Sequence, residues 1–202
     1  MVIIAAVIIV LALVMKNSGF SGDSKSVLFN EDMLAVCSDG KWGYIDKKGS
    51  YVINLMYDGA NSFNNGLAIV MVDGKYGYID NKGAYVINPQ FEGAADFSKN
   101  GLAGICSGEK CGYIDKTGAV VINSQFDSVG TFKKNGLAKV KSGDQIGYIN
   151  EKGVYMINLQ FDDATAFYDD GYAVFVLDGK YGVIDSNGKY VINPLFDEIA
   201  LS

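Results

Sequence analysis

The side chains that most often perform catalysis at neutral pH are scarce in this sequence. It contains no His, and its 17 basic residues are all Lys, against 23 Asp and Glu, which gives a net charge of −6. Without His there is no Ser-His-Asp or Cys-His arrangement and no imidazole metal ligand. Without Arg or a basic patch, the chain has little with which to neutralise phosphates. We therefore expect no enzyme activity, no cofactor, no metal site and no nucleic-acid partner.

Two cysteines have a spacing that would allow a disulfide. Cys106 and Cys111 flank Gly108-Glu109, a pair of residues that suits a two-residue hairpin turn. In such a hairpin the two cysteines would face each other across the strands, about 4.5 Å apart at Cα, at the short edge of the disulfide range. The alternative is that both stay reduced and pack as small apolar side chains. Cys37 has no obvious partner.

Aromatic side chains recur on the expected strands beside Asp and Asn, a combination that could stack on sugar rings. The residues that we single out as ligand-binding candidates are Trp42, Tyr44, Tyr76, Tyr78 and Tyr181. Tyr51, Tyr85, Tyr155 and Tyr190 belong to the same rows. Aromatic and β-branched cross-strand pairs are also ordinary stabilisers of sheets, and the pattern favours this packing role.

Carboxylates recur with the aromatics, at Asp46, Asp80, Asp115 and Asp185, each three residues before a Gly. Clustered oxygen ligands would suit calcium, but one carboxylate in each repeat does not make a cage. Asp at the first position of a type I turn is explained by its bonds to nearby backbone N–H groups. We expect these residues to shape turns.

All these residues belong to a tandem repeat. Gly-Tyr-Ile-Asp, or a close variant, begins at Gly43, Gly77, Gly112, Gly147 and Gly182, with spacings of 34, 35, 35 and 35 residues. In the second repeat, residues 67–72, 76–80 and 85–88 read as three antiparallel strands joined by an Asp-Gly hairpin and an Asp-x-x-Gly turn. The remaining residues, 89–97, fit a connector, a helical turn or a short fourth strand.

Recurrent apolar positions predict the core. Ile recurs at 53, 87, 122, 157 and 192, Ala at 35, 68, 103, 138 and 173, and Phe at 29, 63, 97, 132 and 167. One meander of this size cannot bury its own apolar face, so each copy must be covered by the next.

The motifs resemble those of the WG-repeat family. Residues 41–46 read Lys-Trp-Gly-Tyr-Ile-Asp, residues 86–91 read Val-Ile-Asn-Pro-Gln-Phe, and residues 97–103 carry the Phe-x-x-x-Gly-Leu-Ala motif. The resemblance implies a β-repeat scaffold, often in surface or membrane-associated bacterial proteins, with no general activity. The Trp that gives the family its name occurs only at Trp42. The equivalent positions hold Tyr76, Cys111, Ile146 and Tyr181. That variation indicates a site that needs bulk for packing.

We expect an all-β fold of five three-stranded antiparallel meanders in an open superhelical array, or in a closed five-bladed propeller. We expect residues 1–16 to form an apolar N-terminal helix and residues 17–28 a polar linker. The repeats follow at 29–62, 63–96, 97–131, 132–166 and 167–202. Terminal repeats of such arrays are often atypical.

The first 15 residues are uninterrupted apolar and are followed by Lys16. A helix of this length rises about 22 Å, short of a hydrocarbon core of about 30 Å. We expect a membrane anchor; a signal peptide, an upstream truncation and a helix buried in an assembly are the alternatives. The cell surface or the periplasmic face is the expected location, and Lys16 and Lys25 favour the cytoplasmic face instead.

Three functions are compatible with these features. The first is a non-catalytic, membrane-anchored or surface scaffold that binds a protein partner or itself. The second is a carbohydrate or cell-wall binding module that uses the Tyr and Trp rows. The third is a subunit of a homopolymeric filament with the apolar helix in its interior.

Overall fold

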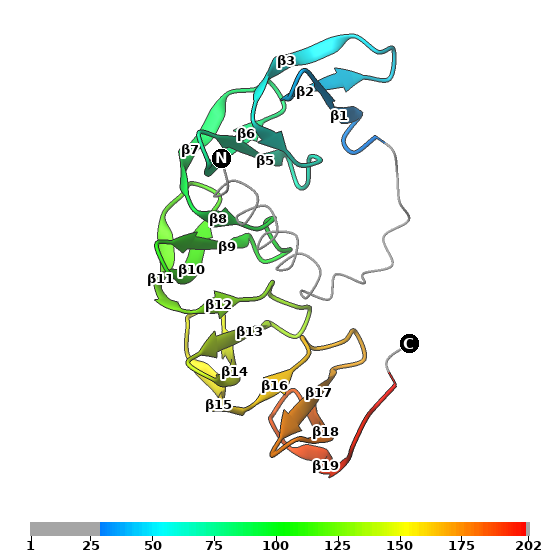
Figure 1. Cartoon of the computed structure of the whole chain (residues 1–202), viewed down its shortest axis with the longest axis vertical. Coiled ribbons are helices and arrows are strands. Elements are labelled where there is room, and N and C mark those ends of the chain that lie inside the picture. The colour runs from blue at the N-terminus through cyan, green and yellow to red at the C-terminus, as the bar shows by residue number, and fades with distance from the viewer. Residues whose placement is uncertain (1–28, 201–202) are drawn as a thin grey trace.

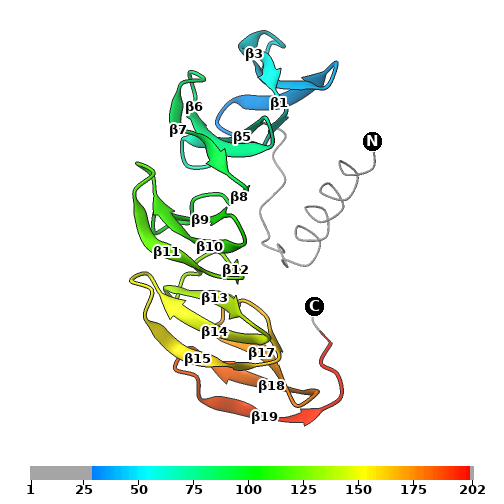
Figure 2. The ribbon, with the colours of Figure 1, turned by 60° about the vertical axis from the view of Figure 1, so that its left-hand side comes forward.

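The computed structural model describes residues 29–200, which form five antiparallel sheets placed one after another along an open arc (Figure 1). The first and last sheets lie at opposite ends of the arc in both views (Figures 1 and 2). The fold is therefore the expected open array and not the closed propeller. The predicted helix of residues 1–16 and the linker 17–28 lie outside the described residues. Among residues 29–200 no helix is long and apolar enough to span a membrane.

Each repeat contributes three main strands, as the motif spacing predicts. The first strands are Met33–Ser38 (β1), Leu67–Val72 (β5), Leu102–Ser107 (β9), Leu137–Ser142 (β13) and Tyr172–Leu177 (β17). The second strands are Lys41–Asp46 (β2), Lys75–Asp80 (β6), Lys110–Asp115 (β10), Gln145–Asn150 (β14) and Lys180–Asp185 (β18). The third strands are Tyr51–Tyr57 (β3), Tyr85–Phe91 (β7), Val120–Phe126 (β11), Tyr155–Phe161 (β15) and Tyr190–Phe196 (β19).

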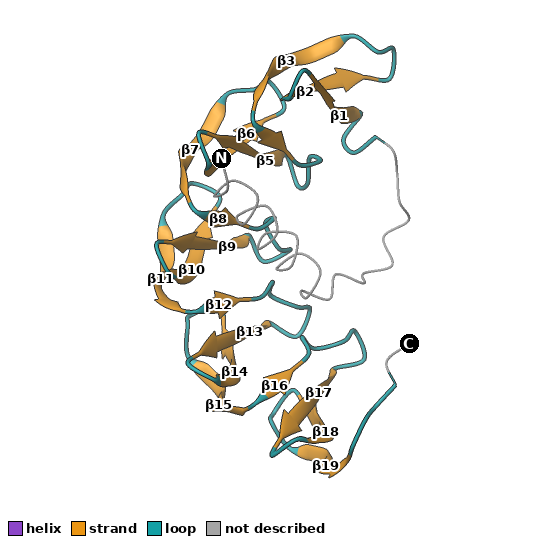
Figure 3. Ribbon diagram, viewed as in Figure 1, coloured by secondary structure: helices purple, strands orange, loops and turns teal. Residues whose placement is uncertain are grey.

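A short fourth strand links the repeats. These strands are Gly59–Ala60 (β4), Gly93–Ala94 (β8), Ser128–Val129 (β12) and Asp163–Ala164 (β16). Each follows the third strand of one repeat but pairs with the first strand of the next, so that β4 joins the sheet β4-β5-β6-β7. Of the readings left open for residues 89–97, the short strand is the one that the structure has. The strands are coloured by secondary structure in Figure 3.

The hairpin between the first and second strands has the predicted turn chemistry. Asp73 and Gly74 both have positive φ, 49° and 74°, as a type I′ turn requires. Gly108 has a positive φ of 62°, which fits the type II′ alternative for the turns that begin with Gly. The strand-to-strand register follows directly from these two-residue turns.

The third strand is longer than predicted because it bulges over a glycine. It continues past Asn88 to Phe91 and includes Pro89. Tyr76 pairs with Phe91 and Tyr78 with Ile87, so the third strand has two extra residues at this point. A Cβ on Gly77 would lie 2.6 Å from the carbonyl oxygen of Ile87, which explains why this position is Gly.

The core lies between neighbouring sheets. Each of the four buried clusters combines residues of two successive repeats, as the recurrent apolar positions predict. One alignment was wrong: Leu34 faces Ile45 as Ala68 faces Ile79, so Leu34 and not Ala35 is the counterpart of Ala68.

Candidate functional site

Tyr44 and Tyr78, two of the candidate ligand-binding residues, lie in the core. Their exposed fractions are 0% and 1%. The hydroxyl of Tyr44 donates a hydrogen bond of 2.8 Å to the carbonyl oxygen of Asn61, and its ring lies 4.8 Å from that of Phe63. Tyr113 and Tyr148 repeat this arrangement with Gly130 and Thr165. These rings are therefore not open platforms for a ligand.

Burial raises the pKa of Tyr44 and Tyr78 well above that of an exposed tyrosine. Both phenols are therefore protonated at neutral pH. Their hydroxyls are thus permanent donors to the backbone that links one repeat to the next.

Trp42, Tyr76 and Tyr181 occupy one equivalent, half-buried position in three different sheets. Each faces the aromatic residue at the end of the third strand: Trp42 faces Tyr57, Tyr76 faces Phe91, and Tyr181 faces Phe196. Trp42 and Tyr76 also pack against the buried clusters. The structure does not bring the five candidates together as one site.

Four exposed tyrosines lie elsewhere, at the start of the third strands. Tyr51, Tyr85, Tyr155 and Tyr190 have exposed fractions of 56%, 41%, 37% and 36%. The residue after each is also exposed and apolar. We call these pairs the outer rim, because the third strand is the outermost strand of each sheet: residues 51–52, 85–86, 120–121, 155–156 and 190–191. In Figure 2, β7, β11 and β15 lie on one side of the arc.

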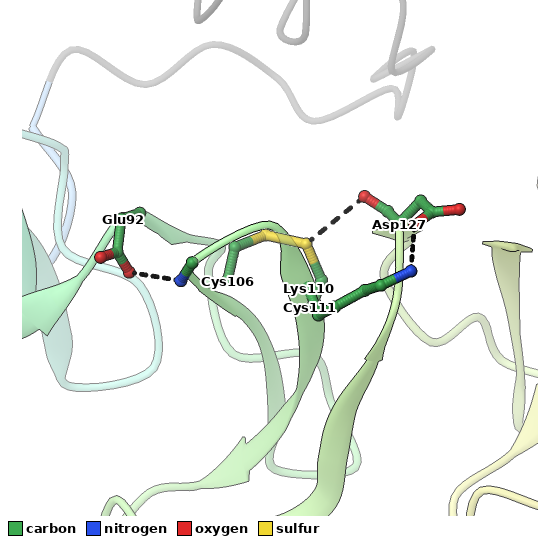
Figure 4. Close-up of a disulfide and its surroundings, with 6 residues drawn as sticks. Glu92, Cys106, Lys110, Cys111 and Asp127 are labelled. Atoms are coloured by element: carbon green, nitrogen blue, oxygen red, sulfur yellow. Dashed lines mark hydrogen bonds and ion pairs between the residues drawn. A yellow bond between two sulfur atoms is a disulfide. The ribbon is translucent and has the colours of Figure 1, made fainter. Parts of the chain in front are cut away.

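The structure places Cys106 and Cys111 opposite each other on β9 and β10 and joins them in a disulfide (Figure 4). Their Cα atoms are 4.0 Å apart. Sγ of Cys111 also lies 3.7 Å from the carbonyl oxygen of Asp127. Cys37 is a free, exposed thiol.

The turn carboxylates have the expected structural role. Oδ1 of Asp46 accepts hydrogen bonds from the backbone N–H groups of Lys48 and Ser50. The same pair of bonds recurs at Asp80, Asp115, Asn150 and Asp185. Within the described residues 29–200, no three His, Cys, Asp or Glu side chains gather as a metal site would require.

A second set of carboxylates connects neighbouring repeats. Asp127 forms an ion pair with Lys110 of its own repeat, and its other oxygen accepts the N–H of Gly143 in the next. Glu92 bonds in the same way to Lys75 and Gly108. The hydrogen bond from the Lys110 ammonium group, followed by that from the Gly143 N–H, lowers the pKa of Asp127. The sequence pattern alone did not single out these bonds, although the Lys and the acid recur 17 residues apart.

The loops before the first strands gather on the concave side of the arc (Figure 1). They line an open pocket of about 300 Å³. Burial raises the pKa of Asp96 there, partly opposed by a hydrogen bond from Asn64. The pocket is lined by Asn64, Asn65, Asp96, Phe97, Ser98, Lys99, Asn100, Thr131, Phe132, Lys133, Lys134 and Asp169. Its amides, carboxylates and ammonium groups are suited to hydrogen bonding with a polar ligand. No sequence motif marks this site, because its residues come from four separate loops.

Several solved structures resemble this one in fold. Hsv2p of Kluyveromyces lactis aligns with a TM-score of 0.52 at 13% identity, over 80% of this chain and 62% of its own. A eukaryotic initiation factor aligns with a TM-score of 0.58 at 9% identity, over 83% and 53%. The dihydro-heme d1 dehydrogenase NirN, in complex with DHE, aligns with a TM-score of 0.53 at 11% identity, over 89% and 47%.

These likenesses concern the fold alone, and the neighbours are propeller-like proteins. The chain spans about half to three fifths of the length of those three structures. No match was found among the curated proteins.

The repeat itself matches a known family model. The model for the WG containing repeat matches residues 42–76, 76–111, 112–145, 146–181 and 181–200. These five consecutive matches extend over most of the chain and carry the same strands that build the five sheets. The chain therefore belongs to the WG containing repeat family.

Proposed function

We propose that this chain is a non-catalytic scaffold that binds a protein partner along its outer rim. The observation that carries the proposal is the exposure of apolar side chains at the same two strand positions in all five repeats. Val52, Val86, Val121, Met156 and Val191 are 41–54% exposed. Large exposed apolar patches commonly mark interaction sites.

The repeat geometry extends this surface. The rim residues lie on the outermost strand of every sheet, so they follow the array from one end to the other. The bulged third strand also offers a free sheet edge, which can add main-chain hydrogen bonds to the side-chain contacts of an extended partner.

Attachment to a membrane through residues 1–16 is the second element of the proposal. It is supported by the uninterrupted apolar run that ends before Lys16. Protease treatment of intact cells tests the expected cell-surface or periplasmic location. Cleavage of the repeats is the expected result, and protection that is lost only on lysis would place them in the cytoplasm.

Crosslinking and capture from native membranes tests partner binding. The full chain is compared with a variant carrying Val86→Lys and Val121→Lys, two changes on exposed rim positions. A control carries Glu109→Lys and Asp144→Lys at hairpin tips. We expect the rim variant to lose the captured protein and the control to retain it. Equal capture by all three chains would refute a role for the rim.

Carbohydrate binding is the second candidate, because the exposed tyrosines Tyr51, Tyr85, Tyr155 and Tyr190 offer ring faces to solvent. A glycan array with the full chain tests it. Binding that is lost in Tyr85→Ala and kept in Tyr85→Phe would support stacking on the ring. The absence of specific binding to any glycan would eliminate this candidate.

A further inference from the structure

We infer that the C-terminal face of this array binds the first strand of a second copy of the chain, so that copies join head to tail. The C-terminal face consists of Ile192, Phe196 and residues 197–200. The surface that receives it on the second copy consists of β1 and of the turn between β2 and β3, which ends at Gly49. This inference goes beyond the proposed function and does not depend on it.

The four internal junctions show what such a face normally contacts. At each junction a two-residue strand from one repeat pairs with the first strand of the next, as Gly93–Ala94 pairs with Cys106 and Ile105. Backbone hydrogen bonds flank this pairing: Glu92 N–H to the carbonyl oxygen of Cys106, 3.0 Å, and Ala95 N–H to that of Gly104, 2.9 Å. The same pair of bonds recurs at the other three junctions.

Side chains complete each junction. The Ile of one third strand meets the turn glycine of the next repeat, and a Cβ on Gly83 or Gly118 would lie 3.3 or 3.2 Å from Ile53 or Ile87. As a result these isoleucines are almost fully buried, with exposed fractions of 3–5% at Ile53, Ile87, Ile122 and Ile157.

The N-terminal side of the array has the receiving half of a junction without its partner. Its sheet has three strands, β1-β2-β3, and within residues 29–200 no short strand covers the edge of β1. Gly49 has the same positive φ as the other turn glycines, 81°, yet a Cβ there would meet nothing within 4 Å. The surface into which an isoleucine fits elsewhere is open here.

The C-terminal side of the array has the other half of a junction, the residues that pack onto the next repeat. Ile192 is 40% exposed and Phe196 is 51% exposed, whereas the four aromatic counterparts of Phe196 are 0–7% exposed. Residues 197–200 follow Phe196 as residues 92–95 follow Phe91, and Asp197 forms the ion pair with Lys180 that its counterparts form in three earlier repeats. The isoleucine, the aromatic residue and the acid of an internal junction are thus present here, and within residues 29–200 they have no partner repeat.

If the junction between copies has the strand register of the internal junctions, the contacts between copies can be named. Asp197 N–H would donate to the carbonyl oxygen of Cys37, and Ala200 N–H to that of Ala35. Ile192 would cover Gly49, and the Asp197 carboxylate would accept the N–H of Asp39, as Asp58 accepts that of Asp73 at 2.8 Å. Val183 stands where the other repeats have Tyr, so the hydroxyl bond that closes the internal junctions is missing. The junction between copies is therefore weaker than those within a copy and reversible.

Because the two surfaces differ, the contact is heterologous and builds rings if the rotation closes and open chains if it does not. Association should rise with protein concentration and should involve both ends of each array.

Cys37 makes the register testable by a single substitution. Glu198 is the counterpart of Gly93, and a Cβ on Gly93 would lie 3.4 Å from Cβ of Cys106, close to the separation found in disulfides. We expect Glu198→Cys to form disulfide-linked ladders under mild oxidation of the full chain in detergent. Adding Cys37→Ser should abolish the ladders, and Lys189→Cys, on an exposed turn, should not form them. A Glu198→Cys chain that crosslinks no better than Lys189→Cys would overturn the inference.

Sedimentation of the full chain in detergent provides the second measurement. Ile192→Lys places a charge on the C-terminal face at a position that is already partly exposed, and Val191→Lys does the same on the outer rim. We expect self-association in wild type and Val191→Lys, with a loss in Ile192→Lys. A wild-type monomer at every concentration, or association that Ile192→Lys leaves unchanged, would overturn the inference.

Discussion

The hydroxyl of Tyr78 donates a hydrogen bond of 2.8 Å to the carbonyl oxygen of Ala95, 17 residues further along the chain. Ala95 lies just after β8, where the backbone crosses from the second repeat to the third. The bond therefore fastens the linking strand to the sheet that it has just left. The ring of Tyr78 also packs 4.9 Å from that of Phe97, so one side chain secures the crossing by both polar and apolar contacts.

Removing this hydroxyl should weaken the array measurably. Tyr78→Phe keeps the ring but leaves the Ala95 carbonyl without its donor, which should lower the free energy of unfolding by about 1–2 kcal/mol. Urea denaturation measures the loss. Tyr85→Phe, on an exposed ring, is the matched control and should have little effect; equal losses in the two variants would contradict the role of the bond.

A methyl group at Gly77 should destabilise the second sheet strongly. Its Cβ would lie 2.6 Å from the Ile87 carbonyl oxygen and the Pro89 nitrogen, both backbone atoms that cannot move aside cheaply. Gly77→Ala should cost at least about 2 kcal/mol. Gly130→Ala is the control, because the nearest atom to a Cβ there is at 3.4 Å. Thermal unfolding of both variants checks the difference, and similar melting temperatures would argue against the bulge.

The disulfide gives a prediction about thiols and stability. The folded chain should contain one reactive thiol, Cys37, and three after reduction under denaturing conditions. Cys106 and Cys111 close a short loop, so replacing both with Ser should lower stability by about 2 kcal/mol in the loop-entropy model. Thiol titration and unfolding of the variant test the two parts. Three reactive thiols in the native chain would mean that the cysteines are reduced.

The carboxylates between repeats predict a dependence of stability on pH. The pKa of Asp127 is lowered by the hydrogen bond from the Lys110 ammonium group and then by the N–H of Gly143. Its contribution is therefore present above the unfolded pKa of about 3.9 and is lost as the pH falls through the folded pKa. The stability difference between wild type and Asp127→Asn should shrink below about pH 4.

Urea midpoints from pH 6 to pH 2 measure this effect. Asp162→Asn is the control, since Gln145 replaces the lysine partner in that repeat. A gap between wild type and Asp127→Asn that stays constant with pH would contradict the assignment.

Local chemistry made much of the fold predictable. Asp73-Gly74 and Gly108-Glu109 define two-residue hairpins, and these fix the register of the first two strands and the facing positions of Cys106 and Cys111. The short strand Gly93–Ala94 could not be predicted, because two small residues have no periodicity and pair only when the next repeat offers its edge. Ala35 was matched to Ala68 by residue type although the two lie 33 residues apart, whereas the first glycine spacing is 34 and leads to Leu34.

The candidate site was less predictable than the fold. Tyr78 and Tyr85 read alike in the sequence, as aromatic residues on strands, yet one is 1% exposed and the other 41%. The difference depends on which face the next sheet covers, a long-range contact. The concave pocket depends on four loops whose proximity is set only by the curvature of the array.

The short strand of each repeat pairs with the next repeat, and this pairing affects how such a chain can change length. Each complete sheet takes its inner strand from one copy of the repeat and its other three from the following copy. A duplicated gene segment of one period, cut at any point within the repeat, would still supply one of each strand. Repeats can therefore be gained or lost during evolution without a new kind of contact. The number of sheets can change between related proteins while the fold of each sheet stays the same.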